Sequence, residues 1–262
     1  MSERWLIAVT AGRWQMNGIA QAREAGLRVL AIDGDPNAEG LKIADRSICH
    51  DLSKHDEIIA LLKESDITSS IRGAVSFCSE VGMELAARIR SDFDLPGLRP
   101  STVRRYLDKG IQRSLWKEKR VPGPRFEIAS DSGQARRAIE NFGFPVIVKP
   151  IDSSGSRGVT KLESPSDDIS AAVERAFEFS RTASVIVESF MEGTEFTVEV
   201  FADRGRVQVL AVTEKKKVPG TRGTVARELA TPLRSPDVVD NLGATVVKAF
   251  EALDYRDGPG HA

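Results

Sequence analysis

Hydrophobic positions in the first hundred residues follow two periods that alternate along the chain. Runs of consecutive apolar residues indicate buried strands, and apolar residues three or four apart predict helices. The strands are predicted at residues 5–10, 28–32, 47–50 and 73–77, and the helices at residues 15–25, 56–63 and 81–89. This alternation favours a Rossmann-like α/β domain whose parallel sheet carries helices on both faces. The Pro/Gly-rich "LPGLRP" at 95–100 ends the domain.

The pattern changes after residue 100. Residues 104–119 predict a basic, helical connector that ends at "VPGPRF". Strands are then predicted at residues 126–129, 145–148, 159–162, 185–188, 195–201 and 206–213, and helices at 133–141 and 237–253. Another helix is expected to open with Ser164 as N-cap, Pro165 in its first turn and Asp167 at its third position. Because residues 202–205 join two strands as a hairpin, the second unit is predicted to be α+β with antiparallel pairs.

Composition excludes several classes of protein. The 262 residues are 41% hydrophobic and 29% charged, with a net charge of −1, so charge gives no argument for a nucleic-acid or membrane partner. Neither a membrane-spanning run nor a signal peptide is recognisable, and the cytoplasm is the expected location. Cys49 and Cys78 are expected to be reduced thiols. The three histidines have no metal-ligand spacing, which argues against a zinc site or a Ser-His hydrolase.

A loop without apolar side chains separates two predicted strands in "FGFPVIVKPIDSSGSRGVTKLE", residues 142–163. Backbone N–H groups of such a loop can form a concave anion site, and small side chains let a phosphate approach closely. Lys149 and Arg157 can neutralise its charge. The loop is not a Walker A motif, because Gly-Lys-Ser/Thr is absent. A plain surface loop is the alternative.

A dinucleotide site in the first domain is a competing hypothesis. Gly12 and Gly18 follow a predicted strand, and Asp33 ends the next one. The glycine spacing departs from GxGxxG, which weakens the hypothesis of an oxidoreductase.

Three further stretches occur in a fixed order with the loop: "DKGIQR", "GFPVIVKPIDSSGSRGV" and "VESFMEGTEFTVEV". Together with "AVTAGRWQ", "GLRVLAIDGDPNAEG", "IADRSI" and "LPGLRP" near the start, they resemble the ATP-grasp superfamily, in particular its carbamoyl-phosphate-synthase-like carboxylate–amine ligases. The resemblance covers nearly the whole chain. It implies a pre-ATP-grasp domain over residues 1–100, a connector over 101–120, a first ATP-grasp lobe over 121–187 and a second lobe, C-terminally incomplete, over 188–262.

The resemblance also implies roles for individual residues. Lys109 and Lys149 would contact the ATP phosphates, and Lys215 would reach a terminal phosphate. The flexible lid over the phosphates would consist of Ser153, Ser154, Gly155, Ser156, Arg157 and Gly158. The hinge that reads adenine would consist of Glu188, Phe190 and Met191, and Glu195 would hold the ribose hydroxyls.

Each role has a plainer alternative. Lys149 could be a surface lysine after a strand, and Glu188 could end a strand in solvent. Glu195 could be an outward strand residue, and Lys215 could belong to a solvated charge run. The sequence identifies no catalytic side chain.

The activity implied by the resemblance is an ATP-dependent ligase. A substrate carboxylate would attack ATP to give an acyl phosphate, which an amine would then displace, with ATP and Mg²⁺ required. The alternatives are a nucleotide-binding module without catalysis and an ATP-grasp phosphotransferase. Both substrates are expected to be small molecules, and the oligomeric state is left open, with a homo-oligomer as one alternative.

The metal ligands of the family are not matched in this sequence. Glu192, Glu199 and Glu228 are acidic but occupy none of the ligand positions, so no metal residue is assigned. The main Mg²⁺ ligands are expected beyond residue 262, and the chain alone is expected to be inactive, with an open sheet edge and exposed apolar surface on the second lobe.

Overall fold

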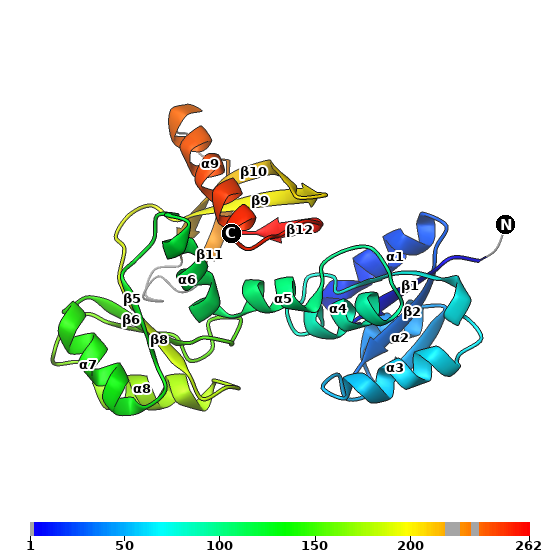
Figure 1. Ribbon diagram of the computed structural model, residues 1–262, viewed down its shortest axis with the longest axis horizontal. Helices are drawn as coiled ribbons and strands as arrows, with labels where there is room; N and C mark the ends of the chain where they lie inside the picture. Colours follow the sequence, from blue (N-terminus) through cyan, green and yellow to red (C-terminus); the bar gives the residue numbers. More distant parts are fainter. Residues whose placement is uncertain (1–2, 218–225, 232–235) are drawn as a thin grey trace. The chain divides into compact units, whose positions relative to one another are not determined.

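The computed structural model describes residues 3–217, 226–231 and 236–262 and divides into two compact units, Met1–Arg104 and Arg105–Ala262. Figure 1 shows three sheets, one in the first unit and two in the second. Each unit is described by itself below.

The first unit is built around a parallel sheet with the strand order β3-β2-β1-β4. Its strands are β1 (Trp5–Val9), β2 (Arg28–Asp33), β3 (Arg46–Cys49) and β4 (Ile71–Val75). Its helices are η1 (Arg13–Gln15), α1 (Met16–Glu24), α2 (Glu39–Ile43), α3 (His55–Glu64), η2 (Thr68–Ser70) and α4 (Met83–Asp92), followed by α5 (Pro100–Leu107) at the boundary. The predicted parallel sheet is confirmed, and α2 is an element that the sequence pattern missed.

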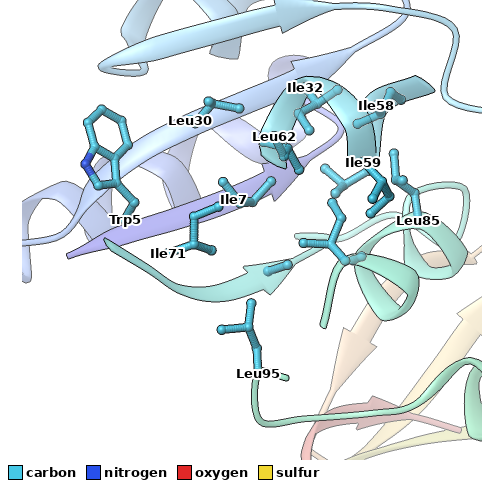
Figure 2. Packing of buried hydrophobic residues seen from close by; sticks show 14 of the residues in the cluster. Trp5, Ile7, Leu30, Ile32, Ile58, Ile59, Leu62, Ile71, Leu85 and Leu95 are labelled. Atoms are coloured by element: carbon cyan, nitrogen blue, oxygen red, sulfur yellow. The ribbon is translucent and has the colours of Figure 1, made fainter. Parts of the chain in front are cut away.

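Both faces of this sheet are buried, which explains why its strands are continuously apolar. Trp5, Ile7 and Val9 belong to one hydrophobic cluster with residues of α3 and α4 on one face, and Figure 2 shows part of this cluster. Leu6 and Ala8 pack with α1 and α2 on the other face. Alternate side chains of a strand point to opposite faces, so one strand serves two cores.

The second unit contains two antiparallel sheets. One has the order β5-β8-β6-β7 and consists of β5 (Phe126–Ala129), β6 (Val146–Pro150), β7 (Thr160–Leu162) and β8 (Val185–Ser189). The other has the order β11-β10-β9-β12 and consists of β9 (Phe196–Asp203), β10 (Arg206–Lys217), β11 (Ala226–Ala230) and β12 (Gly258–His261). The helices are α6 (Lys109–Glu118), α7 (Ser132–Phe142), α8 (Ile169–Glu178) and α9 (Pro236–Ala252).

Helices α7 and α8 cover one face of the sheet β5-β8-β6-β7. Val146, Val148, Val185 and Val187 pack there against apolar residues of the two helices. The intervening residues on β6 and β8, including Lys149 and Glu188, therefore point to the opposite face. This opposite face is the one that presents charged side chains.

One predicted helix start is wrong. Helix α8 begins at Ile169 with Asp168 as its N-cap, not at Ser164. The Asp167 carboxylate instead accepts the backbone N–H groups of Glu163 and Ser164, which closes a turn ahead of the helix. The predicted helical connector consists of α5 and α6, which are separated where Asp108 is extended and caps α6 by accepting the N–H of Ile111 at 2.9 Å. Lys109 thereby becomes the first residue of α6.

The hairpin between β9 and β10 is tighter than predicted. Its turn is Arg204–Gly205, whose φ values of 50° and 88° are typical of a primed two-residue turn. The strands β11 and β12 were not predicted. Residues 258–261 carry the sequence GPGH, which has little strand propensity, yet they pair with β9 in register. Large apolar side chains are exposed on this sheet at Phe201, Leu210 and Leu229.

Candidate functional site

Two predicted site elements meet at the N-terminus of α6. The Lys109 ammonium donates a hydrogen bond to the carbonyl oxygen of Ser153 at 2.7 Å, and the Lys109 backbone N–H bonds to Ile151 O at 2.8 Å. Residues 44 positions apart are therefore joined where the Gly/Ser loop begins. The lysine belongs to the site because Asp108 starts α6 at this point.

A buried ion cluster lies on strands β6 and β8, on the face of the sheet opposite α7 and α8. Glu188 is only 5% exposed and accepts hydrogen bonds from Lys149 Nζ and Arg113 Nε, each at 2.7 Å. Cross-strand pairing explains the contact, since Ile147 lies opposite Glu188, and Lys149, two residues after Ile147, is on the same face of the sheet. Arg113 reaches the carboxylate from α6.

The pKa of Glu188 shows what the cluster does to its charge. Burial by itself would raise the pKa of the carboxyl group, but the Lys149 and Arg113 cations outweigh burial and hold the pKa below its ordinary value of 4.5. Burial lowers the pKa of Lys149, an effect that Glu188 opposes and that the cations Arg113 and Lys109 strengthen. Glu188 is thus paired with two cations, Lys149 and Arg113, and a third cation, Lys109, lies near Lys149.

The loop from Ser153 to Gly158 is anchored at its root and loosely held at its tip. At the root, the Asp152 carboxylate accepts bonds from Ser180 Oγ, Arg181 N and Thr182 Oγ1. At the tip, Gly155 and Ser156 are exposed, and both adopt positive φ. Arg157 donates its Nε–H to the Ser154 carbonyl oxygen within the loop.

The hinge predicted to read adenine provides an aromatic face. Phe190 donates its backbone N–H to Pro145 O at 3.0 Å, which fixes the chain after β8. The Lys161 ammonium lies 4.1 Å from the centroid of the Phe190 ring, a cation–π distance. Met191 follows with 62% of its surface exposed.

Glu195 and Lys215 form a second pair. The Lys215 ammonium bonds to Glu195 Oε1 at 2.6 Å, and its backbone N–H bonds to Glu195 O at 2.8 Å. The pair lies at the start of β9 and on β10, in the sheet β11-β10-β9-β12. Lys215 is thus distinct from its neighbour Lys216, which pairs with Glu228.

Arg113 is a functional residue that the sequence analysis missed. It belongs to the quoted stretch "DKGIQR", and its spacing gave a usable signal. Residues four apart on a helix share one face, so a helix beginning at Lys109 places Arg113 beside it.

The acidic residue of the dinucleotide hypothesis, Asp33, is occupied by backbone contacts in the structure. Asp33 accepts the backbone N–H of Ala11 at 2.6 Å and that of Asp35 at 2.9 Å, so its carboxylate already holds the loop after β1. Gly18 packs against the ring of Phe77, where a side chain would collide. Both residues have structural roles.

Within the described ranges, no group of three His, Cys, Asp or Glu side chains could hold a metal ion. No helix in the same ranges is long and apolar enough to cross a membrane. Two acidic residues considered above are paired, Glu199 with His261 and Glu228 with Lys216.

Comparison with known proteins finds ligases among those similar to this chain. A family model described as the D-ala D-ala ligase C-terminus matches residues 115–221. The D-alanine–D-alanine ligase of Bordetella pertussis is 33% identical over 108 residues, which are 41% of this chain and 33% of that protein. The chain spans less than half the length of the curated relatives it matches.

Solved structures share the fold over the full length of the chain. The crystal structure of an L-amino acid ligase from Bacillus licheniformis aligns with a TM-score of 0.79 and 18% identity, covering 100% of this chain and 63% of that one. The biotin carboxylase domain of the Hydrogenobacter thermophilus 2-oxoglutarate carboxylase, in complex with MgADP, aligns with a TM-score of 0.75 and 21% identity, covering 100% and 60%.

Proposed function

The chain belongs to the ATP-grasp superfamily, and on that premise we propose that it binds ATP and forms part of a ligase that activates a carboxylate for attack by an amine. Residues up to about 100 would then act as the pre-ATP-grasp domain, and the ATP-grasp lobes would follow. The small-molecule substrates and the role of each residue below belong to this proposal.

One observation carries the proposal: Lys109 bonds to the start of the Gly/Ser loop and lies near Lys149, which is on the strand that leads into the loop. Lys109 bonds to the first residue of the loop, and it lies near enough to Lys149 to lower the pKa of that lysine. Two ammonium groups beside a loop of small residues suit a polyphosphate, because the cations supply charge and the loop supplies N–H donors.

The other residues are assigned around the phosphates. Glu188 would accept the adenine amino group beside Phe190 and Met191, and it would also keep Lys149 oriented. Glu195 would accept the ribose hydroxyls, and Lys215, bonded to Glu195, would approach the terminal phosphate. A carboxylate is a good acceptor for a diol, and an ammonium group suits a phosphate.

Phosphoryl transfer of this kind depends on positioning and on charge neutralisation. The γ-phosphoryl group would pass from ATP to a carboxylate oxygen, giving ADP and an acyl phosphate. The amine nitrogen would then attack the acyl carbon and release inorganic phosphate. Mg²⁺ would supply further charge neutralisation, but the described residues do not fit a complete metal site, and no step above is assigned to it.

A trapping assay tests this function. The intact gene product would be incubated with ATP, Mg²⁺ and a panel of amino acids and small carboxylic acids, with hydroxylamine as the trapping amine. An acyl phosphate gives a coloured hydroxamate, so we expect hydroxamate that requires both ATP and one class of carboxylate. Amino acids are the first candidates, because two of the similar proteins are named as ligases of amino acids.

The same assay separates the alternatives. ADP release with a stable phosphorylated product and no hydroxamate would identify a phosphotransferase. ATP binding without ADP release over the whole panel would favour a nucleotide-binding module.

A further inference from the structure

A pocket that shares only Arg113 with the ion cluster described above lies on the second unit. Its volume is about 340 Å³, and it is enclosed by the C-terminal half of α6, residues 121–125, the start of β5 and the end of α7. None of the residues assigned above to ATP lines it. The volume is at the lower end of the range for small-molecule sites.

Three cations line this pocket, and each lies over an aromatic ring. The guanidinium carbon of Arg113 is 4.9 Å from the Trp116 ring centroid, and that of Arg125 is 5.1 Å from the Phe142 centroid. Lys117 Nζ is 5.9 Å from the Phe126 centroid. No lining residue is acidic.

The charge of the pocket is mostly uncompensated. Arg113 is paired with Glu188, outside the lining. Lys117 and Arg125, by contrast, have no carboxylate partner in the described part of the chain. Both side chains are exposed to solvent, and two cations beside a recess without an acidic neighbour attract an anion.

The walls are held in place before any ligand arrives. The Trp116 indole N–H donates to Ala249 O at 2.9 Å. Arg125 donates from its guanidinium to Phe142 O at 3.1 Å, and its backbone N–H bonds to Ser189 Oγ at 3.0 Å. Because Trp116 and Arg125 are held in this way, they lose little conformational entropy on binding.

We propose that this pocket binds a small aromatic carboxylate. The carboxylate would be neutralised by Lys117 and Arg125, and its ring would lie against the apolar wall that Trp116, Phe126 and Val121 provide. Guanidinium groups pair with carboxylates and stack on flat rings, so an arginine in the pocket can recognise both the carboxylate and the ring of such a ligand. A purely inorganic anion would leave the aromatic wall in water.

The test is a titration without nucleotide, followed through the Trp116 indole N–H signal in a ¹H–¹⁵N spectrum. Benzoate is the probe, benzamide is the neutral comparator of the same shape, and inorganic phosphate is the anion without a ring. We expect a saturable shift with benzoate and binding at least about tenfold weaker for both comparators, as expected for losing a charge-assisted contact or the ring contacts.

Charge-removing variants locate the binding. Lys117→Gln and Arg125→Gln should each weaken benzoate about tenfold. Lys119→Gln is the matched control, because Lys119 follows the same helix but does not line the pocket, and its benzoate affinity should equal that of the wild type. Lys117→Gln keeps the assay interpretable if Arg125→Gln proves unstable.

Four results would overturn the proposal. They are the absence of a saturable shift up to the solubility limit, equal affinity for benzamide, equal affinity for phosphate, and wild-type affinity in both pocket variants. Saturating ATP should leave the benzoate shift unchanged; displacement by ATP would place benzoate in the nucleotide site and also overturn the proposal. Because the titration contains no nucleotide, its outcome is independent of whether the chain is a ligase.

Discussion

At the scale of single residues, the proposed nucleotide site contains one buried carboxylate shared by two cations. Glu188 is bonded to Lys149 and Arg113, and its side chain is 6% exposed. Removing one member of a buried pair is costly, because the remaining charge is left without compensation in a medium of low polarity. Glu188 therefore serves both the stability of the second unit and the orientation of Lys149.

We predict that Glu188→Gln lowers the free energy of unfolding by about 3–5 kcal/mol at pH 7, measured by urea denaturation. The pKa of Glu188 is lowered in the folded state, so its stabilising contribution is present above the unfolded value of about 4.5 and is lost as pH falls through the lower, folded pKa. The difference between wild type and variant should thus be constant above about pH 5 and shrink in more acidic solution.

The matched control for this variant is Glu127→Gln. Glu127 is exposed on the adjacent strand β5, opposite Val187. This change should alter stability by no more than about 0.5 kcal/mol at any of these pH values. A Glu188→Gln protein as stable as the control variant would mean that the ion cluster contributes nothing.

At the scale of elements, the loop between β6 and β7 combines a fixed root with a free tip. Two of its glycines have the same backbone conformation but different surroundings. Gly155 and Gly158 have φ values of 65° and 73°. A Cβ at Gly158 would lie 2.8 Å from Pro150 Cγ and 2.9 Å from Phe179 Cβ, whereas a Cβ at Gly155 would meet nothing within 4 Å.

We therefore predict that Gly158→Ala destabilises the protein more than Gly155→Ala. Both variants carry the cost of a left-handed residue, about 1 kcal/mol. Gly158→Ala adds an overpacking cost of about 1–3 kcal/mol, because the neighbouring atoms are at the base of the loop and must move. Thermal or urea unfolding of the pair measures the difference, and equal stabilities would show that the root of the loop is not packed as described.

The loop should also be the element that responds most to nucleotide. Its tip has few anchoring contacts, so we predict fast hydrogen exchange for the backbone N–H groups of residues 154–157 without nucleotide and slow exchange with saturating ATP. Residues 180–182, which hold Asp152 at the root, serve as the internal control and should change little. Protection at the root with none at the tip would contradict a lid that closes over phosphates.

At the scale of the whole molecule, the sequence predicts the order of helices and strands well where the hydrophobic pattern has one clear period. The strands of the parallel sheet have two buried faces, and their apolar runs are distinct. The same signal fails for β12, whose Gly-Pro-Gly-His sequence pairs with β9 only because of tertiary context. Local propensity carries no information about such an edge strand.

The candidate site was predictable in its components but not in their contacts. The sequence marks Lys149 and Glu188 as separate features and assigns them to opposite ends of a nucleotide. Pairing between β6 and β8 brings them to 2.7 Å, a register that short apolar strands do not specify by themselves. Arg113 was missed for a related reason, because the break at Asp108 that sets its helical face depends on one capping bond.

The central claim is that Lys149 and the loop beside it hold the phosphates of ATP. The most direct measurement is calorimetric titration of ATP and of adenosine into the wild type, Lys149→Met and the control variant Lys216→Met. Lys149→Met keeps the aliphatic stem and removes one charge-assisted contact. The binding free energy of ATP should weaken by about 1.5–3 kcal/mol, roughly a ten- to hundredfold loss of affinity, while the affinity for adenosine should change far less. Lys216→Met, which removes the exposed partner of Glu228, should bind both ligands as the wild type does. If ATP and adenosine lost affinity equally in Lys149→Met, Lys149 would lie away from the phosphates and the account of the site would be wrong.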